Sequence, residues 1–169
     1  MPFELRPYPT PTLRPEGAYL QNAWRRSVYP IAHRMDVDIK LPTVSPQPYT
    51  RLAFEGLEFA KDHDQGDQYT DRVMRAFFQE SQDIGDPKVL TQLATGIGLP
   101  ADEFQSALTS HEYASRVEKL LHHAHHEMGI TGVPLFVIGN RTLVGLQSRD
   151  ALADAIEEAE AGIYFQNRP

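Results

Sequence analysis

Residues 131–138 read Thr-Gly-Val-Pro-Leu-Phe-Val-Ile, and this stretch decides the predicted fold. From Val133 to Ile138 the segment is apolar and rich in β-branched residues, which is typical of a buried strand. A proline at the start of a buried strand is unusual because it removes a ladder donor. It fits a strand that opens with a cis Val133–Pro134 bond, which leaves the main-chain N–H and C=O of Val133 free to pair with an extended ligand.

The residues that follow predict a compact supersecondary unit. Gly139-Asn140 is a turn, and Thr142 to Val144 is a second strand, so the two strands form a hairpin. Ser148 is the predicted cap of a last helix that ends near Ala159 and turns Leu152, Ile156 and Ala159 to one face. The tail after it carries no pattern.

The sequence before this unit is predominantly helical in pattern. A short strand is predicted at Pro2 to Arg6, followed by a proline-rich loop. The first helix carries Tyr19, Ala23, Val28 and Ile31 on its apolar side and is interrupted at Pro30. Later boundaries are marked by Asp86-Pro87 at a helix start, by Ser110 as a cap and by Gly129 at a helix end. The predicted helices span about 16–35, 48–64, 67–81, 87–96, 100–108 and 111–128.

Composition excludes several classes of function. The 169 residues carry a formal net charge of −7, so nucleic acid is not an expected partner. No apolar run approaches the ~20 residues that span a bilayer, and Met1 to Leu5 do not form a leader, so we expect no membrane partner and a cytoplasmic location. The chain contains no cysteine, and a thiolate nucleophile or disulfide is therefore impossible within it.

Four regions together resemble the DsbA-like thioredoxin-fold family, in particular its FrnE-like dithiol–disulfide isomerase branch. They are Pro2 to Pro7 with Pro15-Glu16-Gly17, Arg75 to Glu80 with Asp83-Ile84 and Asp86, Gly129 to Ile138, and Val144 to Gln147 with the helix from Ser148. The resemblance covers nearly the whole chain. It implies an α/β fold, namely an incomplete thioredoxin-like fold with a large all-helical insertion. Residues 1–15 and 129–162 would form the thioredoxin-like part, 16–128 the insertion and 163–169 a tail.

The resemblance also implies that a segment is missing. Members of the family begin with a strand and a helix that carries a Cys-x-x-Cys, whereas Met1 aligns just before the second strand. We therefore expect this chain to lack the redox cysteines and the central strand. Two strands would then lose their neighbour. They could pair directly, a second copy of the chain could lend a strand, or the natural protein could be longer than this sequence. We favour the longer protein as the explanation of the sequence and a homodimer through the exposed edges as the behaviour of this chain.

The residues expected to bind substrate are Thr131, Val133, Pro134, Gln147 and Ser148, and no catalytic or metal-binding residue is assigned. Three functions stay open. The first is the docking part of a thiol–disulfide oxidoreductase or isomerase, with the cysteines upstream. The second is a relative of kappa-class glutathione transferases and hydroxychromene-carboxylate isomerases, in which Gln147, Ser148 and Arg149 hold the carboxylate of glutathione. The third is a non-enzymatic module that binds an extended peptide or a partner chain. No cofactor is expected, unless glutathione binds.

Other clusters have simpler interpretations. His122 and His126 have the i, i+4 spacing of metal ligands, but they lie opposite the apolar stripe of their helix and we expect a solvated, pH-sensitive face. Glu80 and Asp83 are interpreted as a charged helix end, and Trp24 with Arg25 and Arg26 is not assigned a site. Four phenylalanines are expected in the core of the helical insertion, where such side chains can also line a ligand groove: Phe54, Phe59, Phe77 and Phe78.

Overall fold

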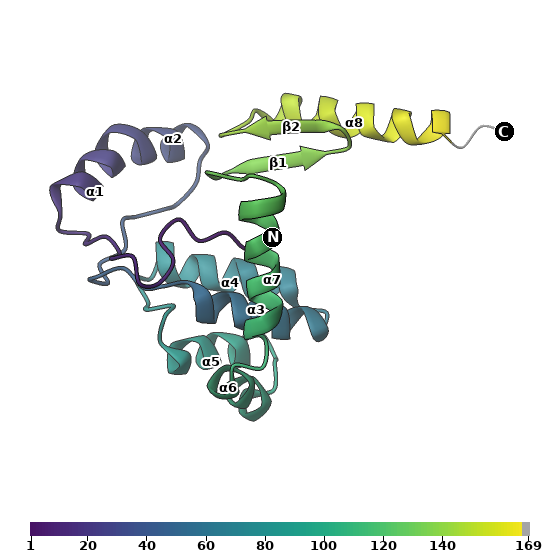
Figure 1. Cartoon of the computed structure of the whole chain (residues 1–169). Coiled ribbons are helices and arrows are strands. Elements are labelled where there is room, and N and C mark those ends of the chain that lie inside the picture. The colour runs from purple at the N-terminus through teal and green to yellow at the C-terminus, as the bar shows by residue number, and fades with distance from the viewer. Residues whose placement is uncertain (167–169) are drawn as a thin grey trace. The chain divides into compact units, whose positions relative to one another are not determined.

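The computed structural model describes residues 1–166, with side chains described as far as Gly162 (Figure 1). The chain divides into two compact units, residues 1–121 and 122–169, and each is described here by itself. Helices and a small sheet occur together, so the predicted α/β class is confirmed. None of the helices within residues 1–166 has the length and apolar character needed to cross a bilayer.

The first unit is built from helices. In order these are α1 (Ala18–Ala23), the π-helical turn η1 (Trp24–Val28), α2 (Tyr29–Arg34), α3 (Arg51–Asp62), α4 (Gly66–Phe78), α5 (Pro87–Gly96), α6 (Ala101–Ser110) and α7 (Ala114–His122).

The core of this unit surrounds α3, which contacts α4, α5 and α6. Aromatic side chains fill its centre: Phe59 and Phe104 meet edge to face with ring centroids 5.2 Å apart, and Tyr69 packs on Phe104 at 5.8 Å. Leu90 and Leu93 close the cluster from α5. Burial of these side chains is the main force that holds the short helices together, since helices of this length are marginal alone.

The first predicted helix forms, but its buried face differs from the prediction. The chain is helical from Ala18 to Arg34, with η1 inserted directly before Pro30 of α2. A proline ring clashes with the carbonyl of the preceding turn, and a π-helical turn relieves that clash. Leu20, Trp24 and Ala32 are buried, whereas Tyr19 is 68% exposed, so the predicted apolar side was wrong at its first residue.

Two helix boundaries test the capping predictions. The Asp86 side chain accepts a hydrogen bond from Lys88 N at 2.8 Å at the start of α5, as predicted. Ser110 does not cap a helix start, since it is the last residue of α6 and the next helix begins at Ala114. The intervening His111 adopts a left-handed conformation with φ 54°, and Glu112 N–H donates to Ala107 O, which ends α6 in a tight turn.

The predicted strand at Pro2 to Arg6 is wrong. This segment has no regular structure, and the sheet within the described residues contains β1 (Leu135–Ile138) and β2 (Arg141–Val144) alone. A strand needs a neighbour for its N–H and C=O groups, and proline at position 2 already removes one donor. The segment is held instead by the buried Glu4, whose carboxylate receives Arg51 Nη2 at 3.1 Å.

The second unit contains the predicted hairpin and helix. After the π-helical turn η2 (His123–Glu127), Gly129 ends the helical segment at φ 60°, as predicted. β1 and β2 pair antiparallel, with Leu135 opposite Val144 and Ile138 opposite Arg141. Figure 1 shows α8 (Arg149–Gln166) running beside this hairpin, and α8 contacts β1.

The hairpin turn is built around Gly139. Its φ of 56° is left-handed, and a Cβ at this position would lie 2.8 Å from Ala159 Cβ of α8. Glycine therefore permits both the turn and the close approach of the helix. Helix α8 continues to Gln166, beyond the end predicted near Ala159, and residues 167–169 of the predicted tail lie outside the described residues. Its buried contact residue is Ala155, whereas Ile156 is 47% exposed.

A row of acidic side chains on α3 was not anticipated. Glu55 and Glu58 are 1% and 2% exposed, which is rare for carboxylates unless they are paired. His111 Nδ1 lies 3.2 Å from Glu55, and Glu58 receives Lys61 Nζ at 2.6 Å and Arg116 Nε at 2.7 Å. The row thus connects α3 to the segments that follow α6.

Asp62 continues this row at the end of α3. Arg116 Nη1 lies 2.7 Å from one carboxylate oxygen, and the Tyr113 hydroxyl donates to the other at 3.0 Å. The hydrogen bond from Arg116 lowers the pKa of Asp62 below its ordinary value, ahead of the smaller effect of Tyr113. The charged carboxylate is therefore the form that the fold stabilises.

Substitution Gly56→Ala is expected to destabilise the first unit. A Cβ at position 56 would overlap the Tyr69 hydroxyl and lie 2.7 Å from Phe104 Cζ. Overpacking of this kind costs about 1–3 kcal/mol. Gly96→Ala is the matched control, because no atom lies within 4 Å of its Cβ position. Chemical denaturation should show a lower free energy of unfolding for G56A and an unchanged or higher value for G96A; equal values would contradict this packing.

Substitution Asp62→Asn is expected to remove a pH-dependent contribution to stability. The folded-state pKa of Asp62 is lowered, so its contribution is present above the unfolded-state pKa of ~4 and disappears as the pH falls through the folded value. Because this side chain is 44% exposed, the effect at pH 7 should stay below about 1 kcal/mol.

The measurement is urea denaturation of wild type and D62N between pH 7 and pH 3. The difference in stability should shrink as the pH falls below about 4. Asp64→Asn is the control, since Asp64 takes no part in the row and asparagine tolerates its left-handed φ of 57°. A D62N deficit that persists unchanged at pH 3 would refute the role of this charge.

Candidate functional site

The predicted substrate-binding residues gather at one end of the hairpin. Thr131, Val133 and Pro134 lie just before the first residue of β1, while Gln147 and Ser148 follow the last residue of β2. In an antiparallel pair these two positions share one end of the sheet. A hydrogen bond of 2.8 Å from Gly145 N–H to Pro134 O joins the two segments directly.

The segment before β1 is open to solvent. The Val133–Pro134 peptide bond is cis, Val133 is 51% exposed, and Thr131 and Pro134 are exposed as well. While the Pro134 carbonyl is engaged by Gly145, the N–H and C=O of Val133 take part in no hydrogen bond among the described residues. Val133 therefore presents one donor and one acceptor to solvent beside an apolar side chain.

The segment after β2 is more fully engaged. Gln147 Nε2 donates to Val144 O at 2.9 Å and to Gly145 O at 3.2 Å, so its amide holds the end of β2. Ser148 Oγ accepts from Ala151 N–H at 3.1 Å and caps α8, as predicted. Leu146 between them and the strand is 57% exposed. These groups shape the end of the hairpin, and both Gln147 Nε2 and Ser148 Oγ already have hydrogen-bond partners.

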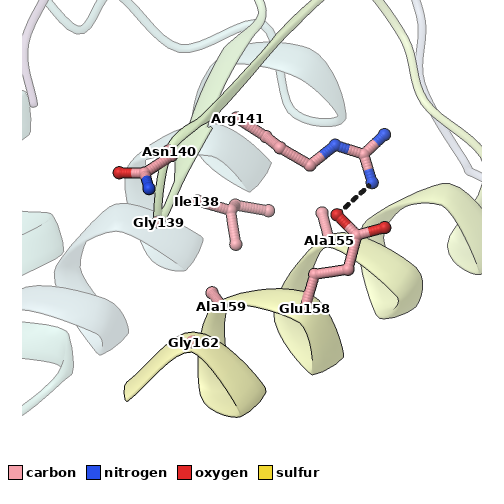
Figure 2. Close-up of a pocket in the computed structure, with 8 residues that line it drawn as sticks. All are labelled: Ile138, Gly139, Asn140, Arg141, Ala155, Glu158, Ala159 and Gly162. Carbon is pink, nitrogen blue, oxygen red and sulfur yellow. Dashed lines mark hydrogen bonds and ion pairs between the residues drawn. The ribbon is translucent and has the colours of Figure 1, made fainter. Parts of the chain in front are cut away.

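A pocket lies at the opposite end of the hairpin and was not anticipated. It occupies about 300 Å³ between the turn at Gly139 and α8 (Figure 2). Arg141 and Glu158 form an ion pair across it, with Nη1 and Oε2 3.1 Å apart. Ala155 and Ala159 form its floor on the helix. Arg141 and Glu158 are each other's ion-pair partners, and they link β2 to α8 beside this pocket.

The histidines of η2 and the preceding turn lie on the surface. The rings of His122 and His126 have centroids 4.6 Å apart, and His123 Nδ1 lies 2.7 Å from Glu127 Oε2. The hydrogen bond from His123 lowers the pKa of Glu127. Within residues 1–166, no three histidine or acidic side chains converge in a way that would hold a metal ion. Trp24, left without a role, is buried against Phe78 with ring centroids 6.2 Å apart.

Comparison with known proteins bears on the family and the fold of this chain. The profile of the DSBA-like thioredoxin domain family matches residues 2–157. The uncharacterized protein YwbO of Bacillus subtilis is 45% identical over 161 residues, which make up 95% of this chain and 80% of YwbO.

Solved structures show the same fold at lower identity. A probable DsbA oxidoreductase of Streptomyces coelicolor superposes with a TM-score of 0.73 at 22% identity, over 90% of this chain. The chain spans 64% of the length of that protein. A 2-hydroxychromene-2-carboxylate isomerase superposes with a TM-score of 0.65 at 19% identity, over 88% of this chain and 70% of the isomerase. The chain belongs to the DSBA-like thioredoxin domain family.

Proposed function

We propose that this chain is the substrate-docking part of a DsbA/FrnE-type thiol–disulfide oxidoreductase or isomerase and performs no dithiol chemistry by itself. The observation that carries the proposal is the solvent-exposed Val133, whose main-chain N–H and C=O are unbonded among the described residues. Exchange requires a thiolate, and residues 1–169 contain no cysteine. In this proposal the thiolate comes from outside these residues.

Docking would proceed by strand addition at the end of the hairpin. An extended peptide running past Val133 can accept a hydrogen bond from its N–H and donate one to its C=O. The exposed side chains of Val133 and Leu146 offer apolar contact without selecting a particular residue. Main-chain recognition with weak side-chain selection suits an enzyme that acts on many unfolded substrates.

Glutathione is the second candidate ligand. It is favoured by the position of the α8 N-terminus, which follows β2 at the same end of the hairpin as Val133, with Ser148 and Arg149 both exposed. Against it, the Ser148 oxygen already caps the helix and Asp150 places a negative charge in the first turn. Isothermal calorimetry with millimolar glutathione decides between the ligands, since heat that disappears in Arg149→Ala would favour glutathione.

A homodimer through the hairpin is part of the same proposal. Leu135 and Val137 of β1 share one sheet face with Thr142 and Val144 of β2, because these residues are paired across the ladder. Val137 and Val144 are 51% and 71% exposed, and both outer strand edges are unpaired among the described residues. A two-stranded sheet is marginal alone and exposes open edges, so a second copy of the chain is the proposed cover.

Substitution Val133→Pro is expected to weaken docking of an extended chain by about tenfold, because it removes one main-chain donor. The ligand is the S-carboxymethylated B chain of insulin labelled with fluorescein, and the measurement is fluorescence anisotropy. Val133→Ala keeps the N–H and should change the Kd by less than about threefold. Equal binding by V133P and wild type, with both variants folded by circular dichroism, would overturn the docking role.

Substitution Val137→Lys is expected to convert a dimer to a monomer, since it places a charge on the exposed sheet face. Sedimentation equilibrium between micromolar and millimolar protein gives the oligomeric state. Val37→Lys is the matched control, because Val37 is 50% exposed but lies in a loop of the first unit. A wild-type chain that stays monomeric at millimolar concentration would refute the dimer.

A further inference from the structure

An apolar pocket opens between α3 and α4 in the first unit. It has a volume of about 200 Å³ and is lined from α3 by Ala53, Phe54 and Leu57, and from α4 by Val73, Met74 and Phe77. An engineered apolar cavity of about 150 Å³ is large enough to bind benzene. The pocket therefore has room for one aromatic or branched aliphatic side chain.

No charged residue lines this pocket, and the polar side-chain groups on its lining residues are the hydroxyls of Thr50, Tyr69 and Thr70. The Thr70 hydroxyl donates to Gly66 O at 2.8 Å. The Tyr69 ring forms part of the wall, but its hydroxyl lies beside Gly56 and Phe104 in the core, and burial raises its pKa so that it stays neutral. A charged or strongly polar occupant would lose its hydration without compensation. The occupant must therefore be apolar.

The residues that line the pocket favour a side chain of a polypeptide over a free small molecule as the occupant. Sites for small molecules combine apolar walls with a few placed polar groups that fix orientation. Of the three hydroxyls on the lining residues, that of Thr70 is already hydrogen-bonded, that of Tyr69 has no partner but is buried in the core, and that of Thr50 makes no hydrogen bond among the described residues. A side chain needs no such group, because its own main chain orients it. Met74 is 54% exposed at this site, and flexible methionines are typical of surfaces that accept varied apolar partners.

The charged residues near the pocket favour one class of polypeptide as the ligand. Asp67 and Asp71 lie one turn before Thr70 and Met74 on α4, and the chain as a whole carries a net charge of −7. The two arginines of α4 are both paired, Arg75 with Asp71 at 2.9 Å and Arg72 with Glu80 at 3.0 Å. Asp67 is therefore the acidic residue of α4 without an ion pair among the described residues. A peptide with basic residues beside its apolar residue is electrostatically complementary to this region, whereas an acidic peptide is repelled.

We infer that the α3–α4 pocket binds one uncharged apolar side chain of an extended, basic polypeptide. The inference rests on the proposed function in taking an extended polypeptide as the substrate, and it adds a substrate class: apolar residues flanked by lysine or arginine. It uses a site within the first unit whose residues are separate from Val133 and the hairpin.

Binding at this pocket can be measured through the fluorescence of Trp24, the single tryptophan of the chain. Trp24 packs against Phe78, and Phe78 is a lining residue. The ligand is the peptide acetyl-Lys-Gly-Phe-Gly-Lys-amide, with a matched peptide that carries serine in place of phenylalanine. The phenylalanine peptide should change Trp24 emission with a millimolar Kd and bind at least about fivefold more tightly than the serine peptide. Equal responses to the two peptides would overturn the inference.

Two variants locate the site. Met74→Gln puts an amide at the pocket and should weaken binding of the phenylalanine peptide by about fivefold. Met35→Gln is the matched control, because Met35 is also 54% exposed but lies outside the pocket, and it should bind like wild type. Amide shift changes in NMR spectra should concentrate at residues 50–57 and 69–78. Shifts confined to residues 131–148, or an unaffected M74Q, would refute the pocket.

The same titration separates this inference from the docking role of Val133. A Trp24 response that persists in V133P supports the pocket even where the insulin chain fails to bind at the hairpin. A wild-type chain that binds the insulin chain but shows no Trp24 response to the phenylalanine peptide, and no shifts at residues 50–57, overturns the pocket and leaves the docking role intact.

Discussion

Main-chain hydrogen bonding is the constraint on which the sheet of this protein depends. A strand is stable only where its N–H and C=O groups find partners. Within the described residues, β1 and β2 satisfy each other along one edge each, and Pro2 to Arg6 has no strand neighbour and stays irregular. The same requirement is the basis of the proposed docking at Val133, since an extended ligand would complete the hydrogen bonds of its main-chain N–H and C=O.

The helical unit meets its constraints in a different way. Its centre is aromatic and close-packed around α3, where Gly56 makes room for Tyr69 and Phe104. The side chains of Glu55 and Glu58 are removed from water on the same helix; Glu58 is paired with Arg116, and Glu55 lies 3.2 Å from the imidazole of His111. Breaking such a pair leaves a buried charge uncompensated, which costs more than the pair contributes. Asp62 extends the row toward solvent, where its contribution is smaller.

The two candidate binding features therefore differ in physical character. At the end of the hairpin, Val133 has an unbonded main-chain donor and acceptor among the described residues, whereas the α3–α4 pocket is a mostly apolar volume without a charged lining residue. Each lies within one unit of the chain. Both features support the proposed role in binding unfolded polypeptides, for which backbone recognition and tolerance of varied apolar residues are both required.

Local chemistry made much of the fold predictable from the sequence alone. The β-branched residues around Gly139-Asn140 predict the hairpin, Asp86-Pro87 predicts the start of α5, and Ser148 predicts the start of α8. These predictions succeed because a turn or a helix cap depends on a few neighbouring residues. The absence of cysteine, and with it of dithiol chemistry in these residues, is likewise a property of the sequence.

Only the tertiary structure decided the features that depend on contacts between residues distant in sequence. The buried Glu55 meets the side chain of His111, which lies 56 positions later. His111 adopts a left-handed conformation, and this turn made Ser110 the end of one helix rather than the start of another. Trp24 is buried because Phe78 packs on it, and Pro2 to Arg6 is irregular because strand pairing is non-local. The α3–α4 pocket is a space between two packed helices, and no pattern within either helix specifies the volume left between them.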